Sequence, residues 1–139
     1  MNKLYKIEHI NGYFRIIKSW DYVEWTINDD FSVNVKIKFD SVIHEKKEYE
    51  YCFMINRNQL NELKEKIDEY KKKNTKTYIA DGQNINIYEY NNGKRTIIAE
   101  QEGIDSIKSI LNFLYSFLEN YFKINYDNNG DYLEPYELL

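Results

Sequence analysis

A strict two-residue repeat is the feature that most restricts how this chain folds. From Phe31 to Phe39, apolar and polar side chains alternate without a break. Because successive side chains of a strand point to opposite faces of a sheet, this repeat predicts a strand with one buried and one wet face. Shorter runs repeat the pattern elsewhere. Their apolar members are Tyr5, Ile7, Val23, Trp25, Ile27, Tyr49, Tyr51, Phe53, Ile55, Ile85 and Ile87.

Turn signals separate these runs. Asn11-Gly12 lies between the first run and another strand-like run at 13–17, and this dipeptide favours a tight hairpin because both of its residues accept positive φ. Further turn signals lie at 28–30, 81–82 and 91–93, and the segment 77–80 is strand-like as well. Strands joined in series by short turns predict antiparallel pairing.

The spacing changes to about 3.6 residues in two segments. Leu60, Leu63 and Ile67 predict a helix near 57–73, with Asn56 as its N-cap and Gln59 completing a capping box. A second apolar stripe predicts a longer helix, and its extra apolar positions predict burial within the monomer, the alternative being a dimer contact. The stripe consists of Ile104, Ile107, Ile110, Leu111, Leu114, Phe117, Leu118 and Tyr121, widened by Phe113 and Tyr115.

These patterns predict one α+β domain over 1–139. It contains an antiparallel sheet of about six to eight strands, with two helices mainly on one face, in the order strands, helix, strands, helix. No apolar segment is long enough for a signal peptide or a membrane span, and the single cysteine excludes an internal disulfide. We therefore expect a cytoplasmic protein in a reducing compartment.

The composition leaves little material for the common catalytic sites. The chain has 2 His, 1 Cys and 5 Gly, and the glycines lack the spacing of phosphate-binding and dinucleotide-binding loops. Asp127 to Asp131 resembles the start of a calcium loop, but Tyr132 occupies the position that needs glycine. Cys52 lies in a strand and is interpreted as a small packing residue. We expect no enzymatic activity, no metal and no cofactor.

Nucleic acid is an unpromising ligand for this chain. Lysines gather at 64–76, and Tyr88 and Tyr90 offer rings for base stacking. Acidic residues alternate with those lysines, however, and the sequence pI is about 5.3, whereas nucleic-acid-binding domains usually exceed about 9. We expect no direct binding to nucleic acid.

The strongest positive signal is an acidic, tyrosine-rich C-terminal segment over 123–139. Residues 101–139 hold 2 basic and 7 acidic side chains, whereas the remainder of the chain is almost neutral. Tyrosine is enriched at protein interfaces because it offers a large rigid surface and a hydroxyl group. The segment is predicted either to dock on the body or to bind a partner. The candidate partner-binding residues are Tyr126, Asp127, Asp131, Tyr132, Glu134, Tyr136 and Glu137, followed by Tyr88 and Tyr90.

These features favour a small inhibitor that binds a basic protein partner and covers its cleft. An immunity protein that neutralises a toxin and a phage protein that blocks a host defence both fit this description. The amino-acid composition is rich in Lys, Asn, Ile and Tyr, which is typical of proteins encoded by low-GC bacteria and their phages. The alternative is an oligomer, of which a homodimer is the simplest, that binds and sequesters a small ligand such as a nucleotide. A third and less favoured class is an enzyme of unusual type that uses Cys52 or a buried carboxylate.

Overall fold

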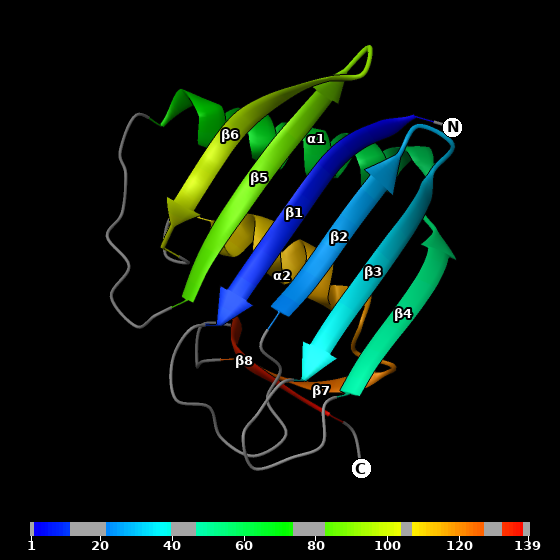
Figure 1. Ribbon diagram of the computed structural model, residues 1–139, viewed down its shortest axis with the longest axis vertical. Helices are drawn as coiled ribbons and strands as arrows, with labels where there is room; N and C mark the ends of the chain where they lie inside the picture. Colours follow the sequence, from blue (N-terminus) through cyan, green and yellow to red (C-terminus); the bar gives the residue numbers. More distant parts are fainter. Residues whose placement is uncertain are drawn as a thin grey trace.

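Eight strands and two helices make up the described part of the chain (Figure 1). The computed structural model describes residues 2–11, 22–39, 47–73, 83–103, 107–126 and 132–137. The strands are β1 (Lys3–Asn11), β2 (Tyr22–Asn28), β3 (Ser32–Phe39), β4 (Lys47–Met54), β5 (Gln83–Asn91), β6 (Lys94–Glu102), β7 (Phe122–Tyr126) and β8 (Tyr132–Glu137). The helices are α1 (Arg57–Lys72) and α2 (Lys108–Ser116).

Six strands form one antiparallel sheet in the order β4-β3-β2-β1-β5-β6, and β7 and β8 form a separate antiparallel pair. The strands from β1 to β4 are neighbours in succession. The chain then passes through α1 to the other side of β1, so that β5 pairs with β1. The prediction of an α+β fold, with an antiparallel sheet and two helices in the order strands, helix, strands, helix, is confirmed.

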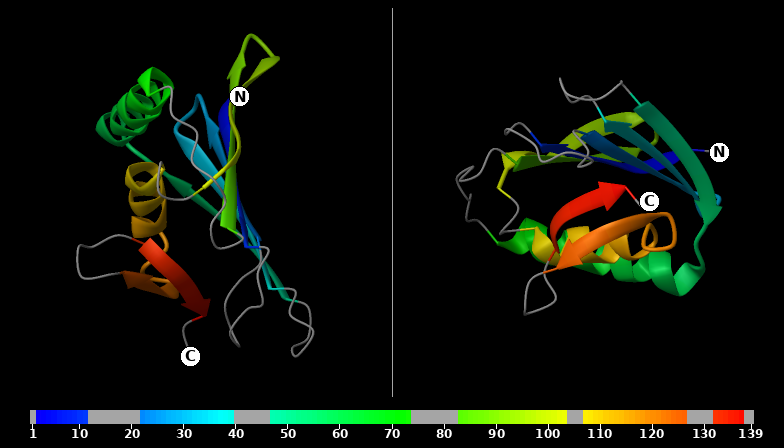
Figure 2. Two further views of the ribbon diagram at one scale, coloured as in Figure 1. Left: turned by 90° about the vertical axis from the view of Figure 1, so that its left-hand side faces the viewer. Right: turned by 90° about the horizontal axis from the view of Figure 1, so that it is seen from below.

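Both helices lie against the same face of the sheet, as predicted (Figure 2). The β7–β8 pair lies on that side as well, and β8 contacts α2. No described helix or strand covers the opposite face, which we call the open face. The fold therefore buries every second side chain of each strand against the helices. The side chains between them lie on the open face.

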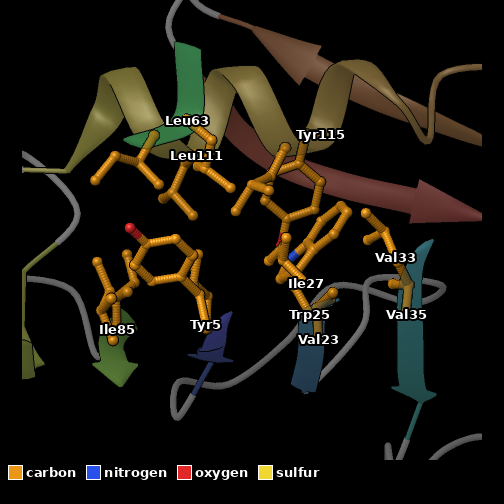
Figure 3. Close-up of a cluster of buried hydrophobic side chains, with 14 of the residues drawn as sticks. Tyr5, Val23, Trp25, Ile27, Val33, Val35, Leu63, Ile85, Leu111 and Tyr115 are labelled. Carbon is orange, nitrogen blue, oxygen red and sulfur yellow. The ribbon is translucent and has the colours of Figure 1, made fainter. Parts of the chain in front are cut away.

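The core forms where the apolar stripes of the helices meet the inward rows of the strands. Figure 3 shows Leu63 from α1 and Leu111 from α2 facing Tyr5 and Ile85 of the sheet. All four side chains are buried, as is Trp25. Cutting such a buried side chain back to alanine removes about 2–5 kcal/mol of stability. The inward members of the two-residue repeat are thus the residues that hold sheet and helices together.

Helix α1 begins as its sequence predicts. The Asn56 side chain accepts a hydrogen bond from the Gln59 backbone N–H at 2.8 Å, and the Asn56 backbone N–H donates to the Gln59 side chain at 2.8 Å. This reciprocal pair satisfies two backbone donors at the start of the helix. Lys71 and Lys72 occupy the last turn, where the backbone carbonyls carry partial negative charge.

Helix α2 is shorter than its apolar stripe predicts. After Ser116 the chain turns with bonds of the tighter i→i−3 kind, from the backbone N–H of Leu118 to the Tyr115 carbonyl and from that of Tyr121 to the Leu118 carbonyl, both at 2.9 Å. Leu118 stays buried, but Tyr121 is 45% exposed and has left the buried stripe. Tyr115 is fully buried, which confirms its predicted burial within the monomer.

The hairpin between β5 and β6 confirms one predicted turn. Asn92 and Gly93 both have positive φ, 52° and 80°, as the two central residues of this tight turn require. The predicted strands at 13–17 and 77–80, the turn at Asp81, and Ile104 lie outside the described residues. Among the helices of the described residues, none has both the length and the apolar character that crossing a bilayer requires.

Candidate interaction surfaces

Polar side chains cross the open face in regular rows because adjacent strands pair in register. The central row runs from Glu50 through Lys36, Glu24 and Glu8 to Asn86, one residue from each of β4, β3, β2, β1 and β5. Lys36 Nζ lies 3.7 Å from the Glu50 carboxylate. Cross-strand pairs of opposite charge stabilise a sheet, whereas like charges directly opposite each other destabilise it. Glu8 opposite Glu24 is therefore the unusual pair in this row.

A tyrosine and a lysine compensate that acidic pair. The Tyr22 hydroxyl lies 2.6 Å from a Glu8 oxygen and 3.2 Å from a Glu24 oxygen, so its single proton is shared between the two carboxylates. Lys6 Nζ lies 3.4 Å from Glu24. Burial raises the pKa of Tyr22, and the hydrogen bond to Glu8 and the charge of Glu24 raise it further. Tyr22 therefore acts here as a persistent hydrogen-bond donor.

Tyr88 and Tyr90 lie on the open face, on the side of β5 that their sequence pattern predicts. Arg95 lies over the Tyr88 ring at 4.7 Å from its centre, and Lys3 lies over the Tyr90 ring at 5.6 Å. Burial raises the pKa of Tyr88, and the neighbouring carboxylate of Glu8 adds to this effect. A cation against each ring holds it in place. These two tyrosines are thus parts of a mixed-charge surface.

A hollow of about 680 Å³ lies on the open face over the first four strands. Basic and acidic side chains alternate around it, so it suits a polar ligand that carries both donors and acceptors. The polar residues that line it are Lys3, Glu24, Thr26, Asn28, Asn34, Lys36 and Glu50, and Cys52 lines it as well.

Cys52 is exposed, so the interpretation of this residue as a packing residue is wrong. It lies opposite Asn34 in the β3–β4 ladder and shares the open face with Glu50. The buried side of β4 is occupied by the alternate residues Tyr51 and Phe53, which pack against the core. The two-residue repeat already placed Cys52 with the charged members of its strand.

The acidic C-terminal segment forms the β7–β8 hairpin. Its ladder pairs Tyr126 with Tyr132, Asn125 with Glu134, and other residues up to Phe122 with Glu137. Tyr136, also a candidate residue, lies opposite Lys123. Asp127 and Asp131, together with the calcium-like run that they enclose, lie outside the described residues. The structure thus brings five of the predicted site residues together in one hairpin: Tyr126, Tyr132, Glu134, Tyr136 and Glu137.

The predicted site residues nevertheless lie on two sides of the molecule. The hairpin lies on the helix side of the six-stranded sheet (Figure 2), whereas Tyr88 and Tyr90 lie on the open face. A partner with one flat contact surface can therefore bind either the hairpin or these two tyrosines, but not both at once. This separation arises because Tyr88 and Tyr90 alternate with the buried Ile85 and Ile87 on β5, whereas the hairpin follows α2 on the helix side of the sheet.

A third surface, an aromatic patch between β4 and the end of α2, was not predicted. Tyr51 and Tyr121 have ring centres 4.5 Å apart, and Phe53 and Phe117 have centres 5.3 Å apart. Phe113 completes the patch, at 5.2 Å from Phe117. The apolar spacing of the sequence instead predicts that Phe113, Phe117 and Tyr121 belong to the core stripe. The exposure of Tyr121 arises only because α2 ends early.

The described residues include no group of three or more His, Cys, Asp or Glu side chains arranged to hold a metal ion. No protein-family model matches the chain, and no curated protein matches it. The surfaces described above are therefore the basis for assigning a function.

Proposed function

We propose that this protein is a stoichiometric inhibitor that binds a basic protein partner and covers the partner's cleft. The observation that carries the proposal is the acidic hairpin β7–β8, which pairs with itself and projects beside the helix layer rather than joining the main sheet. Residues 122–137 contain four acidic side chains and one lysine. Such a segment is attracted to a positively charged cleft and is steered towards it over about a Debye length.

The tyrosines of this hairpin supply the second part of the proposed interface. Tyr126, Tyr132 and Tyr136 lie within the hairpin, where two paired strands restrict the backbone. Tyrosine binds with little loss of side-chain entropy and tends to form energetic hot spots. In this proposal the charges accelerate the encounter and the tyrosines slow dissociation. The protein contributes no catalytic step. An immunity protein or a phage-encoded blocker of a host defence would act in this way in the cytoplasm.

The test is capture of the partner by the tagged full-length chain in the cells that encode it, followed by reconstitution with the purified partner. We expect a complex of near-equal stoichiometry by light scattering. The double variant Glu134→Lys/Glu137→Lys should weaken binding at least about ten-fold, as expected for charge reversal at a close interface. The matched control is Glu62→Lys/Glu65→Lys on the exposed side of α1, which should bind normally.

Two results contradict this proposal. Equal binding by the hairpin variant and the control removes the hairpin from the interface. A stable homo-oligomer without any protein partner favours the second candidate function, sequestration of a small polar ligand. The hollow on the open face is the observation that favours that second function, and a rise in thermal midpoint with an added metabolite would identify its ligand.

A further inference from the structure

The two edges of the main sheet differ in how well they can accept another strand. At one edge, β6 pairs with β5 through two register shifts, and Gln101 has a φ of 50° at one of them. Bulges of this kind bend an edge and protect it from further pairing. At the other edge, β4 pairs with β3 over its whole length without a shift. Within the described residues, β4 has no strand on its outer side. Strand β4 is therefore the edge strand whose regular geometry suits pairing with a further strand.

The side chains of β4 define what an added strand would meet. On the helix side, Phe53 and Tyr51 join the aromatic patch. On the open face, the side chains of Glu48 and Glu50 are 53% and 70% exposed. One face of the edge is thus aromatic, and the other is acidic at Glu48 and Glu50 and continues with the exposed Cys52 and Met54.

Strand β3, which pairs with β4 on its inner side, shows which side chains complement these two rows. Along β3, Val33, Val35 and Ile37 lie opposite the aromatic row of β4. Lys36 and Lys38 alternate with them and lie 3.7 Å from Glu50 and 3.8 Å from Glu48. Because a β4 side chain borders a strand on either side, the outer neighbour meets the same two rows.

We infer that the outer edge of β4 binds an extended segment of the partner in which apolar and basic residues alternate, so that it becomes a seventh strand. Backbone hydrogen bonds along the edge would provide affinity, and the two rows of β4 would provide specificity. The inference rests on the proposed function, because it assigns chemistry to one segment of the basic partner. It also places that segment next to the acidic hairpin, since Tyr121 contacts Tyr51 of β4 and directly precedes β7.

A second copy of this chain is a poorer occupant of the edge. Pairing two β4 strands would bring Glu48 and Glu50 of one copy close to the same residues of the other. Like charges on neighbouring strands are destabilising. The partner strand therefore has to supply the positive charges.

The first experiment uses a labelled peptide with the sequence of β3, residues 32–39, as the probe for the full-length protein. Fluorescence anisotropy measures its binding, and a peptide with glutamate in place of both lysines is the control. We expect only the basic peptide to bind and to slow amide hydrogen exchange in β4. Equal binding of both peptides, protection confined to other strands, or a homodimer built on β4 would overturn the inference.

The second experiment uses variants of the edge. Glu48→Lys/Glu50→Lys should weaken peptide binding about ten-fold, and Glu48→Gln/Glu50→Gln, which avoids new repulsion with β3, should weaken it about three-fold. Circular dichroism would check that both variants fold. The control is again Glu62→Lys/Glu65→Lys.

The same variants separate this inference from the proposed function. If a partner is captured equally well by the wild-type protein and by the β4 variants, the proposed function stands and the inference is wrong. If the β3 peptide binds at β4 but cells yield no partner, the edge is a binding site and the proposed inhibitor function is wrong.

Discussion

Replacing Tyr115 by phenylalanine tests the best-defined polar contact in the core. The Tyr115 hydroxyl and Nδ1 of His9 are hydrogen-bonded at 2.5 Å, and the two residues are 0% and 2% exposed. The ring of Tyr115 also meets the rings of Trp25 and His9 edge-on, at 5.6 and 5.8 Å between centres. Because phenylalanine keeps the ring, Tyr115→Phe removes the hydrogen bond and leaves these ring contacts in place.

The expected loss of stability follows from that single change. A buried hydrogen bond contributes about 0.5–1.5 kcal/mol, so Tyr115→Phe should lower the stability by about that amount. For a chain of 139 residues, each kcal/mol lowers the thermal midpoint by roughly 3–5 °C. Tyr115→Ala removes the ring as well and should lower the stability by about 3–5 kcal/mol.

The assay is urea unfolding followed by circular dichroism. Tyr121→Phe is the matched control, because it removes the same atom from an exposed ring and should change the stability by less than about 0.5 kcal/mol. A double-mutant cycle with His9→Ala isolates the coupling between the two side chains. If Tyr115→Phe is as stable as Tyr121→Phe, the hydrogen bond to His9 does not stabilise the fold and the reasoning is refuted.

Three further predictions concern other elements. Asn56→Ala removes the cap of α1 and should lower the free energy of unfolding by about 1 kcal/mol in urea titrations. Gly93→Ala should lower it by about 1–2 kcal/mol, because φ is 80° there although no atom lies within 4 Å of the added carbon. Burial and the nearby Glu102 raise the pKa of Tyr70 from 10.0 to about 12. The unfolded chain therefore releases this proton first, and stability falls between pH 10 and about 12; Tyr70→Phe should show a shallower fall in alkaline urea titrations.

Elements defined by local sequence patterns were predicted well. The alternation through Val33, Val35 and Ile37 predicted β3, because one residue in two has to face the core. The capping pair Asn56 and Gln59 predicted the start of α1, because the hydrogen bonds involved are only three residues apart. In both cases the interactions that form the element lie within the element itself.

Features that depend on distant contacts were not predicted. The position of β5 beside β1 results from a crossing that no local spacing encodes. The position of the acidic hairpin on the helix side of the sheet, away from Tyr88 and Tyr90, likewise depends on contacts with other elements. The exposure of Tyr121 depends on a switch to i→i−3 bonds that leaves the apolar spacing of the sequence unchanged. The exposure of Cys52 was predictable, since the residue alternates with Tyr51 and Phe53 and thus lies on their opposite face.

The early end of α2 links the edge of the sheet to the acidic hairpin. In a continuous helix, Tyr121 would follow Leu118 by three residues and lie on the same buried stripe. The tighter turns instead bring Tyr121 to Tyr51 of β4, and the next residue begins β7. The aromatic patch and the start of the hairpin therefore both follow from the early end of α2, and the patch places them beside the regular edge of β4. If one partner occupies all three, as we propose, charge reversals in β4 and in the hairpin should both weaken the same complex. Tyr121→Ala should weaken it as well, because it alters the contact that joins these two surfaces.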